Sequence, residues 1–93
     1  MLSQIPINLK QQNSKETDKQ ILRVGLIAEL DAVSLYEQLA ACTNNEDIKK
    51  ILLDVAKEEK THIGEFQNLL LARDQEQVTE LKAGQKEVEE ELR

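Results

Sequence analysis

Two apolar stripes, each with the spacing of a buried helix face, constrain this chain more than any other feature. Positions four and three residues apart form the first stripe, which consists of Leu22, Leu26, Glu29, Val33, Tyr36 and Ala40. The second stripe has the same rhythm and consists of Ile48, Leu52, Val55, Glu59, His62, Phe66 and Leu69. This alternation is typical of helices that bury one seam against a partner. The sequence therefore predicts an all-α fold.

The polar segment between the stripes predicts a reversal of the chain. It reads Thr43-Asn44-Asn45-Glu46, and Thr43 and Glu46 have the spacing of a capping box for the helix that follows. We expect an antiparallel two-helix hairpin over residues 14–72, preceded by an N-terminal arm over residues 1–13. Gly25, inside the first helix, suggests a close approach between helices, because glycine there costs about 1 kcal/mol relative to alanine.

A break at Arg73-Asp74-Gln75 separates the hairpin from a short C-terminal helix over residues 73–93. The apolar stripe of this helix is sparse, and Gly84 can divide the helix in two. Each hairpin helix has only one seam to cover, and one hairpin buries little by itself. We therefore expect copies of the chain to complete a common core.

Ionisable residues interrupt both stripes, at Glu29 in the first and at Glu59 and His62 in the second. Burying a carboxylate or an imidazolium without a partner costs several kcal/mol, and metal coordination is a leading way to compensate it. Glu29 precedes Asn44 by as many residues as Glu59 follows it, so both lie about 22 Å from the turn. The three side chains are therefore expected to converge in the hairpin.

Glu59 and His62 form a Glu-x-x-His motif, which places a carboxylate and an imidazole one turn apart on one helix face. Di-iron sites of ferritin-like bundles use a glutamate on each of two helices and Glu-x-x-His on each of the other two. This chain supplies half of that set, and a two-fold dimer would complete a ferritin-like four-helix bundle with a di-iron (Fe²⁺/Fe³⁺) centre. Two ferrous ions would balance the four carboxylates.

Other interpretations of these residues remain open. A Glu-x-x-His motif often lies on a solvated surface, and buried Glu and His can instead form a hydrogen-bond network that fixes helix pairing. Tyr36 either donates a hydrogen bond to a metal-bound carboxylate or is an aromatic core residue with a satisfied hydroxyl. Glu58 points about 100 degrees away from Glu59 and is expected on the surface.

Composition excludes several classes of function. The net charge of −6 disfavours nonspecific nucleic-acid binding and is compatible with attracting cations. No apolar run has the length of a membrane span, and no cleavable signal is expected at the N-terminus. The single cysteine, Cys42, fits a reducing compartment.

Residues 21–73 resemble the encapsulated ferritins, short ferritin-like proteins housed inside bacterial and archaeal encapsulin shells. The resemblance is carried by Ala-Glu-Leu-Asp-Ala-Val at residues 28–33, Tyr-Glu-Gln at 36–38 and Glu-Glu-Lys-Thr-His at 58–62. It implies that Glu29, Glu59 and His62 are iron ligands. It also implies that Tyr36 lies beside the site and that Asp31 lies on the iron approach. Two positions depart from the pattern, with Ala28 where an acidic residue can occur and Leu35 where a tryptophan can occur.

The resemblance implies a ferroxidase that oxidises ferrous iron for storage inside an encapsulin shell, in the cytoplasm. Its dimers are expected to form a ring, a decamer, through the C-terminal helix, and a short tail beyond Arg93 is expected to dock on the shell. A rubrerythrin-like di-metal peroxide reductase is one alternative, although a Cys-x-x-Cys centre is lacking. A structural helical oligomer without enzymatic activity is the other.

Overall fold

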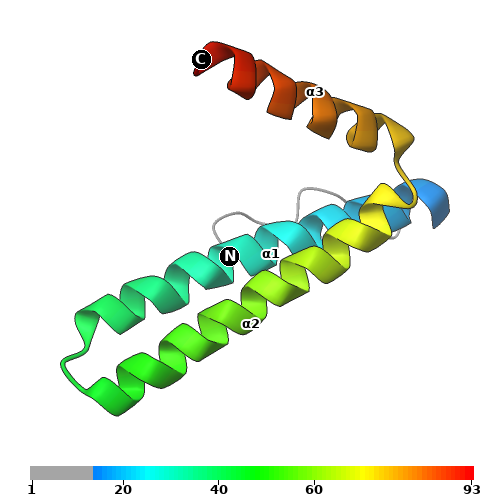
Figure 1. The fold of residues 1–93 in the computed structure, drawn as a ribbon. Coiled ribbons are helices and arrows are strands. Elements are labelled where there is room, and N and C mark those ends of the chain that lie inside the picture. Colours follow the sequence, from blue (N-terminus) through cyan, green and yellow to red (C-terminus); the bar gives the residue numbers. More distant parts are fainter. Residues whose placement is uncertain (1–13) are drawn as a thin grey trace.

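The structure, a computed structural model, describes residues 14–93, so the expected arm over residues 1–13 lies outside the described part. Three helices follow one another: α1 (Ser14–Cys42), α2 (Glu46–Leu71) and α3 (Gln75–Glu91). Helices α1 and α2 run antiparallel and side by side, and α3 leaves from the end of α2 (Figure 1). The prediction of an all-α hairpin followed by a shorter helix is confirmed.

The turn between α1 and α2 is capped differently from the prediction. Asn45, not Thr43, is the N-cap of α2, and its side chain accepts a hydrogen bond of 3.0 Å from the backbone N–H of Ile48. Asn45 has the extended backbone of a cap residue, with φ −87° and ψ 117°. The Thr43 hydroxyl accepts the backbone N–H of Asn45 at 3.1 Å, so it stabilises the turn instead. The predicted capping box was therefore wrong, while the helix boundary at Glu46 was right.

Three glycines lie inside helices and have different surroundings. A Cβ built on Gly25 would lie 3.1 Å from two ring atoms of Phe66, which confirms the close helix approach. Gly64 and Gly84 have nothing within 4 Å of such a Cβ. Helix α3 continues through Gly84, so the suggestion that this residue divides it was wrong. A single glycine costs about 1 kcal/mol relative to alanine but keeps the helical hydrogen bonds.

The core of the single chain is a narrow seam between α1 and α2. Within residues 15–93 the buried side chains are Leu22, Ala40, Ala56 and Leu70, and none of the buried residues there is polar. Many larger apolar side chains remain exposed, among them Leu30, Leu35, Ile48, Ile51 and Leu69. The Cα radius of gyration is 16.6 Å, against about 12 Å for a compact domain of this length. The hairpin thus leaves much apolar surface uncovered.

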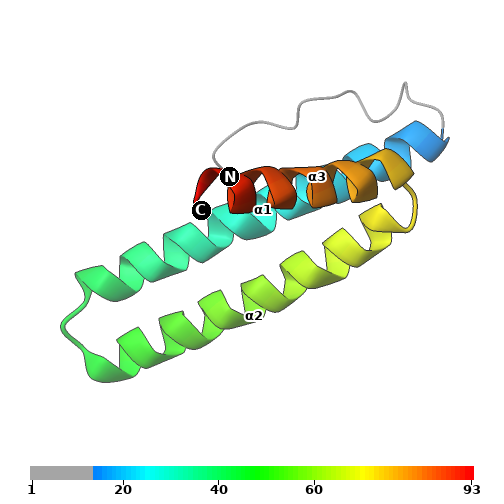
Figure 2. The ribbon, with the colours of Figure 1, turned by 45° about the horizontal axis from the view of Figure 1, so that its top comes forward.

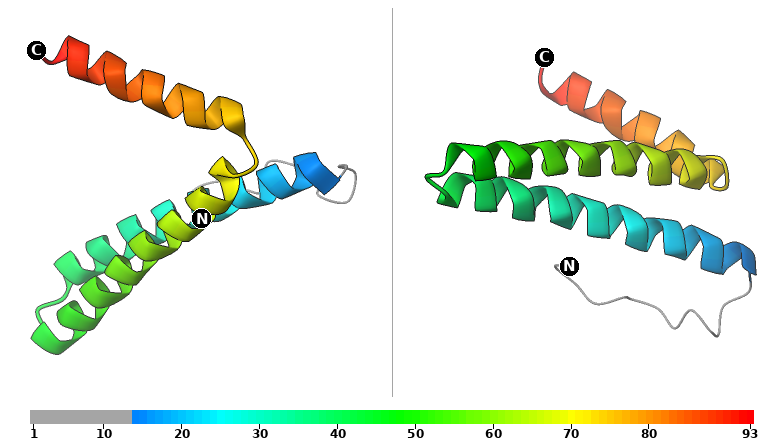
Figure 3. Two further views of the ribbon diagram at one scale, coloured as in Figure 1. Left: turned by 45° about the vertical axis from the view of Figure 1, so that its right-hand side comes forward. Right: turned by 90° about the horizontal axis from the view of Figure 1, so that it is seen from below.

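Helix α3 is joined to the hairpin at one end and diverges from it along its length. It overlaps α1 in the view of Figure 2, but Figures 1 and 3 show that the two helices are separated. Asp74 caps α3 by accepting the Gln77 backbone N–H at 3.0 Å, and its other carboxylate oxygen accepts from Arg23 Nη2 at 2.8 Å. In the described part of the chain, all three helices are too polar or too short to cross a membrane.

Candidate metal centre

The hairpin brings Glu29 of α1 next to Glu59 and His62 of α2. The Asn45 turn sets this register, because it starts α2 directly after the reversal and places the glutamates at similar distances from the turn. The Glu29 and Glu59 side chains are 17% and 19% exposed, whereas His62 is 42% exposed. The carboxylates therefore lie in the seam, and the imidazole lies at its edge.

The imidazole lies almost equally close to the two carboxylates. His62 Nδ1 is 3.5 Å from Glu29 Oε2 and 3.6 Å from Glu59 Oε2. One ligand atom from each of the three residues falls within 4.8 Å of the other two. Ligand atoms bound about 2.1 Å from one tetrahedral ion lie roughly 3.4 Å apart. The separations from Nδ1 therefore match those around a single metal ion.

One carboxylate oxygen at this cluster has no hydrogen-bond partner. Glu29 Oε2 is buried and accepts no hydrogen bond from the described residues, although His62 Nδ1 is its close neighbour. Buried polar atoms are nearly always satisfied by protein, water or an ion. A cation held by the three residues would satisfy this oxygen, and carboxylate and imidazole donors suit iron, manganese and zinc. The residues present therefore fit a metal ion.

The protonation of the cluster reflects its mixture of like and opposite charges. The pKa of Glu29 is raised, first because its carboxyl group can share a proton with Glu59 and then because burial disfavours the charged form. Partial burial works against charging of His62, but the attraction of Glu29 and Glu59 outweighs it and raises the imidazole pKa. Without a metal, a proton therefore takes part of the role of a cation between the carboxylates.

The remaining candidate residues lie outside this cluster. Tyr36 is half-buried two turns after Glu29 on α1, and its hydroxyl makes no hydrogen bond to the three residues in the part of the chain described. Glu58 is exposed, as its direction on α2 predicted. Asp31 is half-buried on α1. The structure thus brings together the three ligand candidates and places Tyr36 two turns away along α1.

Phe66 lies near the cluster, although the sequence analysis identified it only as a member of the second apolar stripe. Its ring lies against the α1 backbone at Gly25, one turn beyond the cluster on both helices. The glycine inside α1 was the signal for a close contact. Its partner could not be found from the sequence, because the contact joins residues of different helices.

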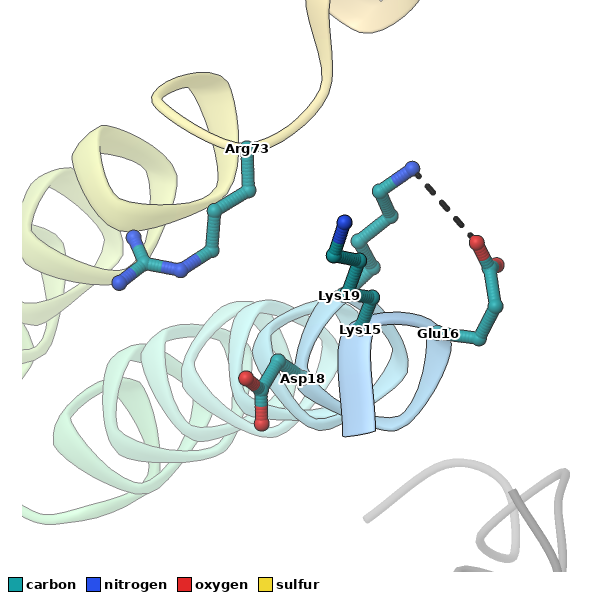
Figure 4. Close-up of a pocket in the computed structure, with 5 residues that line it drawn as sticks. All are labelled: Lys15, Glu16, Asp18, Lys19 and Arg73. Carbon is teal, nitrogen blue, oxygen red and sulfur yellow. Dashed lines mark ion pairs between the residues drawn. The ribbon is translucent and has the colours of Figure 1, made fainter. Parts of the chain in front are cut away.

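A surface hollow lies at the end of the hairpin opposite the turn between α1 and α2. Its volume is about 350 Å³, and it is lined by Lys15, Glu16, Asp18, Lys19 and Arg73. Figure 4 shows these five side chains. Lys19 Nζ lies 3.8 Å from Glu16 Oε1, and the two side chains are 27% and 51% exposed. None of the cluster residues lines the hollow, and ion pairs between exposed side chains contribute little energy. The half-buried cluster is therefore the stronger candidate.

Comparisons with known proteins bear on the family and the fold of the chain. A family model described as Rubrerythrin matches residues 20–92. The crystal structure of the encapsulated ferritin domain from Pyrococcus furiosus superposes with a TM-score of 0.84 at 53% identity. That match covers 97% of this chain and 92% of the solved one, so the fold is ferritin-like.

Two curated proteins are similar in sequence. The chain is 57% identical over 84 residues to a ferritin-like-encapsulin shell fusion protein of Pyrococcus furiosus. The aligned region covers 90% of this chain and 24% of that protein. It is 39% identical over 71 residues to the encapsulin nanocompartment cargo protein EncC of Myxococcus xanthus. This aligned region covers 73% of this chain and 55% of that protein. The chain thus spans about a quarter of the first relative and about half of the second.

Proposed function

Because this chain belongs to the rubrerythrin family and is an encapsulated ferritin-like domain, we propose that it is a ferroxidase that oxidises ferrous to ferric iron. Iron is the substrate, and each Fe²⁺ gives one electron to dioxygen. The centre is built from Glu29, Glu59 and His62 of two copies of the chain.

The observation that carries this proposal is the convergence of three ligand candidates around one buried, unsatisfied oxygen of Glu29. A centre that binds ferrous iron transiently requires carboxylates that cations can reach and that are not held in ion pairs with lysine or arginine. Glu29 and Glu59 meet this requirement, since each keeps some exposure and neither pairs with a lysine or arginine in residues 15–93.

Each residue has a separate role in the proposed centre. Glu29 and Glu59 chelate and bridge the iron ions and neutralise the charge that increases on oxidation. His62 anchors one ion through a ring nitrogen, for which the imidazole must be neutral. Tyr36 acts beside the centre, where its hydroxyl can donate a hydrogen bond to a carboxylate.

The three ligands of one chain suggest that the centre is shared between copies. His62 is 42% exposed, and Ile51 and Leu69 lie on the same face of α2, 60% and 46% exposed. A second hairpin packed against this face would cover the apolar side chains and add its own three ligands. The resulting four carboxylates balance two ferrous ions, as in ferritin-like di-iron bundles.

Larger assembly follows from the remaining apolar surface and from the relatives. We propose residues 14–72 as the ferritin-like hairpin, preceded by an arm over residues 1–13, and residues 73–93 as the contact that links dimers into a ring, a decamer. Three apolar residues in α3 and at its C-cap are 46% to 78% exposed, as such a contact requires: Leu81, Val88 and Leu92. The relatives named as an encapsulin fusion and an encapsulin cargo support a location in the lumen of a cytoplasmic encapsulin compartment, where ferric iron is stored.

Iron oxidation by purified protein tests the proposal. Fe²⁺ is added anaerobically, air is admitted, and the ferric product is followed by ultraviolet absorbance together with oxygen uptake. Glu29→Ala, Glu59→Ala and His62→Ala are each expected to reduce the rate to that of buffer, because one substitution deletes two ligands of a dimeric centre. Glu58→Ala is the matched control, since Glu58 is exposed beside Glu59, and it should keep the wild-type rate. Wild-type rates in all three ligand variants would exclude the centre.

A peroxide reductase is the second candidate, favoured by the match to the Rubrerythrin family model. The same protein loaded with Fe²⁺ distinguishes the two activities, because a ferroxidase consumes dioxygen and a peroxide reductase reacts faster with hydrogen peroxide. A purely structural oligomer would bind no Fe²⁺ in equilibrium dialysis, whereas both enzymes would.

A further inference from the structure

The Phe66 ring lies against the backbone of α1 at the point where that helix has no side chain. A Cβ built on Gly25 would be 3.1 Å from Phe66 Cδ1 and Cε1 and 3.2 Å from Cζ. Ordinary van der Waals contact begins at 3.4 Å, so such a Cβ would require the ring or the helix to move by a few tenths of an ångström. The absence of a side chain at residue 25 therefore sets how closely α1 approaches α2.

This contact lies one helical turn from the metal cluster on both helices. Gly25 comes one turn before Glu29 on α1, and Phe66 comes one turn after His62 on α2. Side chains of a helix lean toward its N-terminus, so the Phe66 ring lies over the turn that carries His62. Both elements that hold the cluster therefore meet at the Gly25–Phe66 contact.

We infer that the Gly25–Phe66 contact positions the metal ligands by setting the spacing between the helices that carry Glu29 and His62. The inference rests on the proposed metal centre and identifies residues that act on it without binding the metal. Metal–ligand distances in well-formed sites lie within about 0.2 Å of their standard values. A shift of a few tenths of an ångström at Gly25 is therefore large on the scale of the site.

Gly25→Ala is the direct test, with Co²⁺ as a spectroscopic probe of the site. The methyl group should displace the ring and the helix, weaken Co²⁺ binding by about tenfold and alter the visible Co²⁺ spectrum. Gly64→Ala is the matched control, since Gly64 lies in α2 two residues after His62 and a Cβ there meets nothing within 4 Å. Gly64→Ala should bind Co²⁺ like the wild type.

A compensating variant separates positioning from a general packing defect. Leucine is shorter than phenylalanine, so Gly25→Ala combined with Phe66→Leu should regain the wild-type Co²⁺ affinity and spectrum. Thermal melting of the metal-free proteins checks that each variant is folded. A purely structural contact would change the melting temperature of Gly25→Ala and leave the Co²⁺ spectrum unchanged.

The outcomes distinguish this inference from the proposed function. If the wild type binds Co²⁺, Glu59→Ala does not, and Gly25→Ala matches the wild type in affinity and spectrum, the positioning role is refuted and the metal centre stands. If wild type and Glu59→Ala bind Co²⁺ equally weakly, the metal centre is refuted, and the positioning role with it. Weaker binding by Gly25→Ala, restored in the double variant, supports the inference.

Discussion

Arg23 and Asp74 form a 2.8 Å hydrogen-bonded ion pair that joins the N-terminal third of α1 to the N-cap of α3. The Asp74 side chain is 11% exposed and uses its other oxygen to cap α3 through the Gln77 backbone N–H. Beyond this point α3 diverges from the hairpin (Figure 3). The same carboxylate therefore caps α3 and ties the start of that helix to α1.

Replacing Asp74 with alanine should loosen α3 more than it destabilises the hairpin. Loss of the cap costs about 1 kcal/mol, and loss of the ion pair adds less than about 1 kcal/mol because Arg23 is 45% exposed. Amide hydrogen exchange should accelerate about fivefold to tenfold in residues 75–91, with little change in α2. Asp74→Asn, which retains a capping oxygen, should lie between the wild type and Asp74→Ala. Equal protection of α3 in all three proteins would contradict this role of Asp74.

The lowered pKa of Asp74 also predicts how the attachment of α3 responds to acid. The pKa of Asp74 is lowered, mainly because the Gln77 backbone N–H donates to the charged form, with Arg23 assisting. A lowered pKa stabilises the folded state above the unfolded value, here 3.8, and this stability is lost as the pH falls through the folded value. The protection of α3 amides, relative to their exchange in an unfolded chain at the same pH, should therefore fall below about pH 4 in the wild type. Asp74→Asn should lack this acid step, and an identical acid profile in that variant would count against the assignment.

Metal-free protein should become less stable as the pH rises through the His62 titration. Glu29 and Glu59 raise the His62 pKa, so the stability gained from the charged imidazole is complete below 6.5 and is lost as the pH rises through the higher folded value. The raised pKa of Glu29 has the same sign and acts from about pH 4.5 upward. Thermal melting in the presence of a chelator should show this decline. His62→Gln should reduce its alkaline part, and an unchanged slope would show that His62 is not charged between the carboxylates.

Metal should drive association, because the proposed centre exists only where two chains meet. A ligand present at 100 times its dissociation constant stabilises the form that binds it by about 2.7 kcal/mol, or about 100-fold. At concentrations where free chains are detectable, Fe²⁺ added anaerobically should convert them to a larger, uniform species in native mass spectrometry. Glu59→Ala should show no conversion, and Glu58→Ala should behave as the wild type. An oligomer distribution that ignores Fe²⁺ would exclude a metal bridge between chains.

Local pattern was sufficient to predict the helices, the hairpin turn and the grouping of Glu29, Glu59 and His62. Helical periodicity depends on residues a few positions apart, and the length of the turn sets which residues of two antiparallel helices come level. The choice of cap was beyond this reasoning. Thr43 and Asn45 both have capping side chains, and the geometry of the turn decided that Asn45 caps α2 while Thr43 accepts its N–H.

Tertiary structure alone decided the contacts between residues distant in sequence. The break before α3 was visible in the sequence, but the pairing of Arg23 with Asp74, and hence the departure of α3, depended on the packing of α1 and α2. Gly25 indicated a close approach between helices, and only the packed helices showed that Phe66 is its partner, one turn from Glu29 and His62. Periodicity determines which face of a helix is buried. The residue that each side chain of that face meets depends on the rotation and spacing of the two helices, and these are set jointly by all the side chains of the interface.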